Sequence, residues 1–254
     1  MNIAVLVKYI PNPEGTPEMG PDNRLRREGV DGGLDPGDEH GVEAALQLGG
    51  DGGEVTVVTM GPEAAGGALR RALSMGAHKA VQITDDSLKG ADTLVTARVL
   101  AKALQRGQYD LILAGVESTD GYTGTVPQAI AALLGIPSAT FARKIEAKDG
   151  SVRIERQTET GYDDVESSLP AVVTVTAGAN EPRYPTLKGI MQSKQKPLEQ
   201  LSVSDLGLSG EDVKPTQEVM GLEAVPAKEA GEVVEANEET PAKVVEFLKA
   251  AKVI

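Results

Sequence analysis

The sequence of 254 residues contains no cysteine and no tryptophan, and it has only two histidines. Without cysteine, disulfides, thiolate catalysis and cysteine-ligated zinc or iron–sulfur centres are excluded. His40 and His78 lie far apart in the chain, which excludes a histidine-rich metal site. We therefore expect no metal site.

Basic and aromatic residues are both scarce. The chain has 25 Lys and Arg against 38 Asp and Glu, a formal net charge of −13. Binding to nucleic acid requires clustered Lys and Arg, so we expect no nucleic-acid partner. The acidity suits solubility or a partner with a basic face. Because aromatic residues make up only 3% of the sequence, the core must consist of Val, Ile, Leu and Ala.

Long apolar runs are also missing. Residues 3–7 are continuously apolar, but the run is too short for a signal peptide or a membrane span. A strand buried on both faces of a parallel sheet explains it better. We expect a cytoplasmic protein without direct membrane insertion.

Strand and helix patterns alternate up to residue 135. We predict strands at 3–7, 55–60, 80–83 and 111–114, and helices after Asp35, after Pro62, over 92–106 and over 127–134. This order predicts an α/β fold: a mostly parallel sheet with helices on both faces, of the Rossmann-like type that binds adenine nucleotides. The polar stretch 11–33 is expected to cross the surface.

The pattern changes beyond residue 138. Two strand-like runs flank Lys148-Asp149-Gly150, which predicts a hairpin, and 171–176 is another apolar strand. We therefore expect added antiparallel strands. Asp163, Asp164 and Glu166 could be an acid pair, but a solvated strand edge that blocks aggregation explains them better.

Two domains are predicted. Residues 1–208 form the α/β nucleotide-binding domain, and 209–254 form an extended acidic arm without periodicity over most of its length. The arm ends in a helix that begins at Thr240-Pro241 and carries Val244, Val245 and Leu248 on one face. We expect this C-terminal helix to dock on a partner subunit.

The loop after the fourth strand is the strongest candidate site. Residues 115–125 are rich in Gly, Ser and Thr and lead into a helix, whose start offers free N–H groups and a positive dipole end. Such a loop either binds a phosphate or is an ordinary capped turn, and its sequence leaves both open. It lacks the glycine fingerprint of a classical NAD site and the P-loop motif.

Other polar positions offer little chemistry. Asp35 could accept a hydrogen bond from a ribose or an adenine, although a plain helix N-cap explains it too. Ser118 and Thr125 have no nearby histidine. Lys8, at the end of the first strand, is expected to extend its charge to solvent. No catalytic constellation appears, so we expect no active site in this chain.

A short apolar helix follows residue 186. Leu187, Ile190 and Met191 could pack into the core or stand on the surface as an anchor for another protein, and their spacing leaves both possibilities open. Lys188, Lys194 and Lys196 make the surroundings basic in an otherwise acidic chain.

The segment from Leu169 to Met191, with its Asn180-Glu181-Pro182-Arg183-Tyr184 run, resembles the beta subunits of electron transfer flavoproteins. The similarity extends to Asp35-Pro36, to the run 59–62 and to the Asp120-Gly121 loop, and it covers nearly the whole chain. The resemblance implies a heterodimer whose alpha subunit holds FAD, while the beta subunit supports the FAD domain and binds AMP. Electrons would come from flavin dehydrogenases of the acyl-CoA type and pass to a membrane quinone oxidoreductase.

The resemblance also implies site residues. The AMP phosphate is expected at the backbone N–H groups of Gly124, Thr125 and Val126. The nucleoside is expected near Leu6, Asp35, Met60, Ser118 and Gly121. Dehydrogenases are expected to dock on Tyr184, Leu187, Ile190 and Met191, with Leu187 as the anchor.

The sequence departs from the family pattern at three places, one of which is Thr160, where Gly or Asp is usual. Asp35 stands where Asn is frequent, and Gly124-Thr125-Val126-Pro127 replaces a frequent Asn-Gln-Thr-Gly. One branch of the family binds a second FAD in place of AMP and bifurcates electrons; its loop usually runs Asp-Gly-Asp-Thr, and this chain has Asp120-Gly121-Tyr122-Thr123. The segment 180–184 resembles the AMP-binding branch, so AMP is favoured.

Two further alternatives are a stand-alone adenine-nucleotide-binding module and an adenylating enzyme. The module would not need the acidic arm or the segment 180–191. The enzyme would need a Ser-Gly-Gly pyrophosphate loop, which the sequence lacks.

Overall fold

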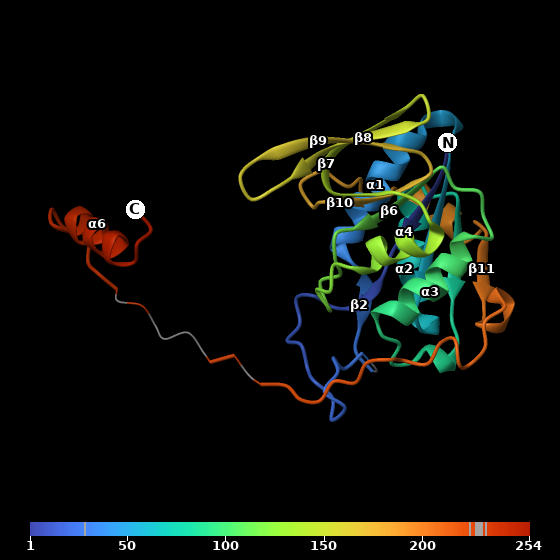
Figure 1. Ribbon diagram of the computed structural model, residues 1–254, viewed down its shortest axis with the longest axis horizontal. Helices are drawn as coiled ribbons and strands as arrows, with labels where there is room; N and C mark the ends of the chain where they lie inside the picture. Colours follow the sequence, from blue (N-terminus) through green and yellow to red (C-terminus); the bar gives the residue numbers. More distant parts are fainter. Residues whose placement is uncertain (28, 224, 227–230, 232) are drawn as a thin grey trace. The chain divides into compact units, whose positions relative to one another are not determined.

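The computed structural model describes residues 1–27, 29–223, 225–226, 231 and 233–254. The chain divides into two compact units, Met1–Met220 and Gly221–Ile254. Nine strands of the first unit form one sheet in the order β11-β5-β4-β1-β6-β10-β7-β8-β9 (Figure 1).

The centre of the sheet is parallel, as the sequence predicts for the strands up to residue 115. The strand 171–175, expected in the region of added antiparallel strands, is parallel too. The parallel centre consists of β1 (Asn2–Leu6), β4 (Glu54–Met60), β5 (Lys79–Ile83), β6 (Leu111–Gly115) and β10 (Ala171–Val175). A further parallel strand, β11 (Leu198–Leu201), pairs with β5 and was not predicted. Apolar and polar residues do not alternate in β11, because only its two end residues are apolar. Its sequence therefore does not indicate a strand.

Antiparallel strands extend the other side of the sheet. β7 (Ser138–Lys148) and β8 (Ser151–Gln157) form the predicted hairpin, and β9 (Tyr162–Ser168) pairs with β8. These are the yellow strands of Figure 1. β9 is the edge strand, and its Asp163, Asp164 and Glu166 are exposed, so the expected solvated edge is confirmed.

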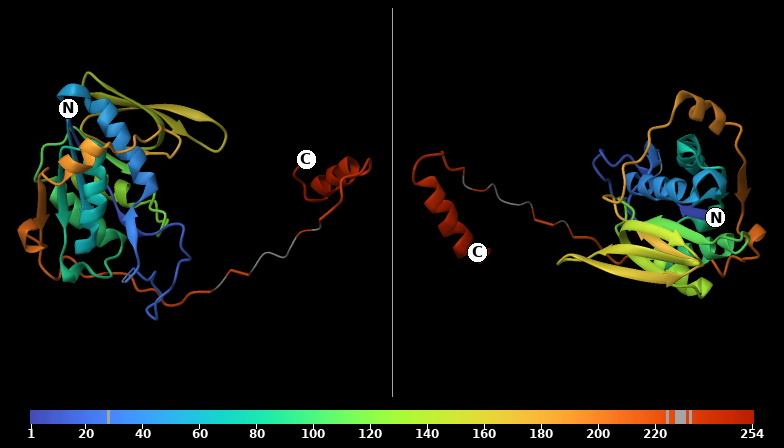
Figure 2. Two further views of the ribbon diagram at one scale, coloured as in Figure 1. Left: turned by 180° about the vertical axis from the view of Figure 1, so that it is seen from behind. Right: turned by 90° about the horizontal axis from the view of Figure 1, so that it is seen from above.

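Helices cover both faces of the sheet (Figure 2). The side chains of the central strands are therefore buried on both faces. In β1, Ile3 and Val5 face one core with α1 (Pro36–Gly49) and α2 (Gly66–Met75), whereas Ala4 and Leu6 face the other. The second core contains α3 (Thr93–Leu104) and α4 (Val126–Leu134). The predicted α/β architecture is therefore confirmed.

Short elements complete the first unit. Four 3-10 turns are η1 (Gly50–Gly52), η2 (Glu63–Ala65), η3 (Asp86–Leu88) and η4 (Ser204–Leu206). A small antiparallel pair that was not predicted, β2 (Tyr9–Pro11) and β3 (Gly32–Leu34), joins the two ends of the predicted surface excursion. Residue 28 of that excursion lies outside the described residues.

The first unit extends beyond the predicted boundary at residue 208. Val213 is buried, Arg98 donates to the carbonyl oxygen of Asp212, and Asp92 accepts hydrogen bonds from the N–H and hydroxyl of Thr216. These polar contacts hold residues that composition alone assigned to the arm. Of the predicted arm, residues 224, 227–230 and 232 lie outside the described residues.

The second unit contains one helix, α6 (Thr240–Ala250), and none of its residues is buried. Val244, Val245 and Phe247 are exposed apolar side chains on it. No helix in the described part of the chain combines the length and the hydropathy that a membrane crossing needs.

The short helix α5 (Leu187–Ser193) is fixed to α2 by polar contacts. Arg70 donates to the carbonyl oxygen of Ser193, and the Lys196 Nζ donates to the carbonyl oxygens of Leu73 and Ala77 at 2.9 and 2.6 Å. Burial lowers the pKa of Lys196. Of the three lysines around α5, Lys196 therefore caps the end of α2.

Gly189 lets α5 approach α2 closely, because a Cβ on it would overlap the carbonyl oxygen of Ser74. We predict that Gly189→Ala lowers the free energy of unfolding by about 1–3 kcal/mol, since the new methyl group must displace backbone. Urea unfolding measures this change. Gly67→Ala is the control: it lies in α2 with nothing within 4 Å of an added Cβ, and it should be neutral or stabilising. Equal effects of the two substitutions would contradict the close approach.

Candidate functional site

The carboxyl ends of the parallel strands form one edge of the sheet. In the order β5-β4-β1-β6, β1 ends at Leu6, β4 ends at Met60, and β6 leads into the loop 116–125. Leu6 is buried in the second core and Met60 packs against it. In an open α/β sheet, ligands bind at this edge. The tertiary structure thus brings two predicted nucleoside neighbours and the predicted phosphate loop to one place.

Asp35 connects the start of α1 to this loop. Its Oδ1 accepts a hydrogen bond from the Gly37 N–H at 2.9 Å, the predicted N-cap contact. Its Oδ2 accepts from the N–H and the hydroxyl of Thr119, at 2.7 and 3.2 Å. The side chain has no exposed surface. Asp35 therefore holds the loop through Thr119, and both of its oxygens are engaged within the chain.

Asp38 is a second buried carboxyl group at the same helix start, and the sequence analysis missed it. Its Oδ2 accepts a hydrogen bond from the Lys8 N–H at 2.7 Å. Burial, with a further contribution from the charge of Asp35, raises the pKa of Asp38 to about 8, although hydrogen bonds from the Lys8 and Gly115 backbones oppose the shift. Acidic residues in a first helical turn, here Asp38 and Glu39, are a common pattern, so the sequence carried no specific signal.

Lys8 lies against the loop and does not simply extend into solvent. Its Nζ donates to the Ser118 hydroxyl at 3.1 Å and to Asp120 Oδ1 at 2.6 Å. Arg27 donates to the other oxygen of Asp120, Oδ2, through Nε at 3.0 Å and Nη2 at 2.7 Å. Burial opposes the charge on Asp120, but the two cations hold its pKa below the ordinary value. Arg27 comes from the surface excursion and carried no signal in the sequence.

The end of the loop offers free backbone donors. The N–H groups of Gly124, Thr125 and Val126 donate no hydrogen bond to any residue that the structure describes. Thr125 is the N-cap of α4, and its side chain makes no capping bond. The N-terminus of α4 carries the positive end of the helix dipole. This arrangement suits a bound anion such as a phosphate.

The predicted docking residues lie elsewhere, around α5, and they are exposed. The exposed fractions are 86% for Tyr184, 83% for Leu187, 46% for Ile190 and 73% for Met191. The alternative that Leu187, Ile190 and Met191 pack in the core is therefore wrong. Ser74 and the Lys196 contacts occupy the side of α5 that faces α2, so the apolar side chains are left outward.

An ion pair fixes the chain before α5. Arg183 donates through Nε to Glu43 Oε2 at 2.7 Å and through Nη2 to Oε1 at 2.9 Å. Burial raises the pKa of Glu43, but the Arg183 hydrogen bonds outweigh burial and lower it overall. His40 Nδ1 lies 3.1 Å from the Asn180 carbonyl oxygen, and Asn180 Nδ2 donates to the His40 carbonyl oxygen. These contacts tie residues 180–183 to α1.

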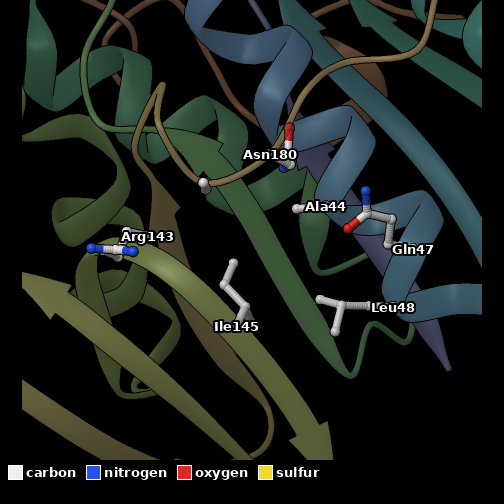
Figure 3. A pocket seen from close by; sticks show the side chains of 7 residues that line it. Ala44, Gln47, Leu48, Arg143, Ile145 and Asn180 are labelled. Atoms are coloured by element: carbon white, nitrogen blue, oxygen red, sulfur yellow. The ribbon is translucent and has the colours of Figure 1, made fainter.

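A cavity of about 250 Å³ lies between α1 and β7 (Figure 3). It is lined by Ala44, Gln47, Leu48, Arg143, Ile145, Ala179 and Asn180. None of these is a predicted nucleotide-binding or docking residue. The cavity is thus separate from both candidate sites. Among the described residues, no group of three or more His, Asp or Glu could hold a metal ion.

Comparison with known proteins shows which family the chain resembles. A family model described as "Electron transfer flavoprotein domain" matches residues 22–206. The whole chain is 41% identical to 99% of the "Electron transfer flavoprotein subunit beta" of Mycobacterium tuberculosis (strain ATCC 25618 / H37Rv). It is 36% identical, over the full length of both chains, to the protein of the same name from Thermoanaerobacterium thermosaccharolyticum. It is also 36% identical, over 92% of each chain, to "Caffeyl-CoA reductase-Etf complex subunit CarD" of Acetobacterium woodii.

The raised pKa of Asp38 predicts a pH-dependent stability. Between about pH 4 and pH 8 the folded protein keeps a proton on Asp38 that the unfolded chain releases, so this stabilisation is complete below pH 4 and is lost as the pH rises to 8. We predict that Asp38→Asn makes the free energy of unfolding fall less steeply from pH 5 to pH 7, by up to about 1.4 kcal/mol per pH unit.

Urea unfolding at several pH values measures this slope. Asp51→Asn is the control, because Asp51 is an exposed acidic residue in η1, and its slope should equal that of the wild type. An unchanged slope in Asp38→Asn would show that the Asp38 carboxyl group is ionised throughout this range.

Proposed function

The chain belongs to the electron transfer flavoprotein family, as its beta-type subunit, and on that premise we propose that it acts as an electron-carrier subunit without an active site of its own. In this proposal it binds AMP, pairs with an FAD-holding alpha subunit and presents a docking surface to flavin dehydrogenases. Electrons would pass on to a quinone oxidoreductase.

The free N–H groups of Gly124, Thr125 and Val126 are the observation that carries the nucleotide assignment. Three adjacent donors at the start of a helix match the oxygens of one phosphate group. Lys8 and Arg27 add positive charge beside the same loop. The residues present therefore fit a nucleoside monophosphate.

The nucleoside has an apolar floor in this proposal. It would lie along the sheet edge near Leu6 and Met60, with Ser118 and Gly121 on the loop beside it. Since both oxygens of Asp35 are bonded within the chain, we propose that Asp35 acts on the nucleoside through the position of Thr119. Direct contact with the nucleoside would require the surrounding residues to move, because Asp35 has no exposed surface.

The docking assignment rests on the exposed apolar side chains around α5. An apolar anchor on a rigid support loses little conformational freedom on binding, which favours association. Arg183 fixes the chain before α5, and Lys196 fixes the chain after it. Leu187 is the proposed anchor for a flavin dehydrogenase of the acyl-CoA type.

A second candidate function is a bifurcating subunit that binds FAD in place of AMP. The Asp120-Gly121-Tyr122-Thr123 loop, intermediate between the two branches, favours it, and one relative is named as a subunit of a caffeyl-CoA reductase complex. The proposed arm, including α6 with its unburied apolar residues, would bind the alpha subunit in either case.

Native mass spectrometry of the complex from its own cells tests the cofactor. We predict a heterodimer that carries one FAD and one AMP. Two FAD molecules would replace the proposal with the bifurcating function. A single chain with a bound adenine nucleotide and no second subunit would support a stand-alone module.

Docking is tested by Leu187→Ala. Loss of the anchor should lower kcat/KM for electron acceptance from the dehydrogenase about tenfold, while the FAD content of the heterodimer stays constant. The control is Leu133→Ala, which truncates another exposed leucine, on α4. An equal loss in both variants, or a loss of FAD in Leu187→Ala, would contradict the docking assignment.

A further inference from the structure

The surface excursion after β1 has a folded shape of its own. Residues 12–27 and 29–31, which we call the strap, begin and end beside each other, because the Asn12 N–H donates to the Asp31 carbonyl oxygen at 2.9 Å. Within the strap, Met19 pairs with Leu25 in an antiparallel bridge, and the Arg26 N–H donates to the Glu18 carbonyl oxygen. The strap is the blue loop beyond β2 in Figure 1.

The strap contacts the loops that follow two different strands. The guanidinium group of Arg24 lies where a Cβ of Gly90 would be, in the loop after β5 and η3. Arg27 donates two hydrogen bonds to Asp120, in the loop after β6. The strap is therefore held at two points of the carboxyl edge of the sheet.

The sheet order shows what lies between those two points. β4 and β1 stand between β5 and β6. Their last residues, Met60 and Leu6, form the apolar floor of the proposed nucleotide site. A segment that contacts the loops after β5 and β6 lies at the same edge of the sheet as the ends of β4 and β1. The strap thus lies at the edge at which the nucleotide is proposed to bind.

Asp120 joins the strap to the proposed phosphate loop. Its side chain is only 3% exposed, whereas the side chains of its partners Lys8 and Arg27 are 40% and 44% exposed. Lys8 follows β1 directly, and its backbone is hydrogen-bonded to Asp38 and Asp35 at the start of α1. Arg27 belongs to the strap, and its two bonds can break without any change in the sheet.

We propose that the strap closes over the bound nucleotide and that the Arg27–Asp120 ion pair holds it closed, which makes Arg27 a positioning residue that sets the rate of nucleotide exchange. The inference rests on the proposed nucleotide site and adds a mechanism of exchange to it. Breaking this ion pair frees the Arg27 side of the strap to move away from the end of β1, while Arg24 stays beside Gly90. Salt should speed the release because it screens this pair.

The test uses the complete heterodimer and 2-aminopurine riboside 5′-monophosphate, a fluorescent analogue of AMP. In Arg27→Gln the dissociation rate of this probe should rise roughly three- to tenfold. Arg27→Lys should recover part of the loss, because it restores the charge but not both hydrogen bonds. Dissociation from the wild type should quicken with ionic strength, and in Arg27→Gln that dependence should shrink.

Arg26→Gln is the matched control. Arg26 is the neighbouring residue of the strap and makes an exposed ion pair with Glu18, away from the loop. Its dissociation rate should equal that of the wild type. Hydrogen exchange over residues 12–27 gives a second measurement that needs no nucleotide, and it should be faster in Arg27→Gln than in Arg26→Gln.

The outcomes separate the two proposals. If the wild type binds the probe but Arg27→Gln releases it no faster than Arg26→Gln, the strap mechanism is wrong while the nucleotide site stands. Equal hydrogen exchange in the two variants also refutes the strap. If the wild type does not bind the probe, both proposals fall.

Discussion

The contacts of Lys8 connect the sheet to everything at its carboxyl edge. Its N–H donates to Asp38, its carbonyl oxygen accepts from the Asp35 N–H, and its Nζ reaches Ser118 and Asp120. One residue therefore positions the end of β1, the start of α1 and the loop after β6. The proposed site depends on this junction, because the loop has no regular secondary structure of its own to hold it.

The junction places several carboxyl groups close together at limited exposure. Such a cluster is tolerated because each group has donors: Asp35 has Gly37 and Thr119, and Asp120 has Lys8 and Arg27. Asp38 has backbone donors only, and burial raises its pKa to about 8 although these hydrogen bonds oppose the shift. The acidic character of the chain thus extends into its proposed site.

The proposed docking surface around α5 is apolar and exposed, in contrast to the charged junction at the sheet edge. Its apolar side chains stay exposed because the polar contacts of the segment are all directed inward. Glu43 holds Arg183, and the carbonyl groups at the end of α2 hold Lys196. An exposed leucine normally gains stability when it turns inward. Here the inner side of α5 already contacts α2 at Gly189, which leaves no room for the leucine side chain. Rigid support and apolar exposure are therefore coupled.

Much of the fold could be predicted from local patterns. The apolar runs of β1, β4, β6 and β10, the Asp35-Pro36 cap and the Asp149-Gly150 turn each report their own conformation. β11 could not be predicted because its four residues gain stability from pairing with β5, far away in the sequence. The same holds for residues 209–220, whose composition resembles an arm although side chains of α3 hold them on the first unit.

The sequence by itself determined the α/β class, the position of the loop after β6 and the apolar residues around α5, because periodic burial and turn chemistry are local properties. Only the tertiary structure decided which charges meet. Arg27 and Asp120 are 93 residues apart, and Glu43 and Arg183 are 140 residues apart. Such pairs depend on the order of strands in the sheet, and the sequence around a charged residue does not indicate which residue it pairs with.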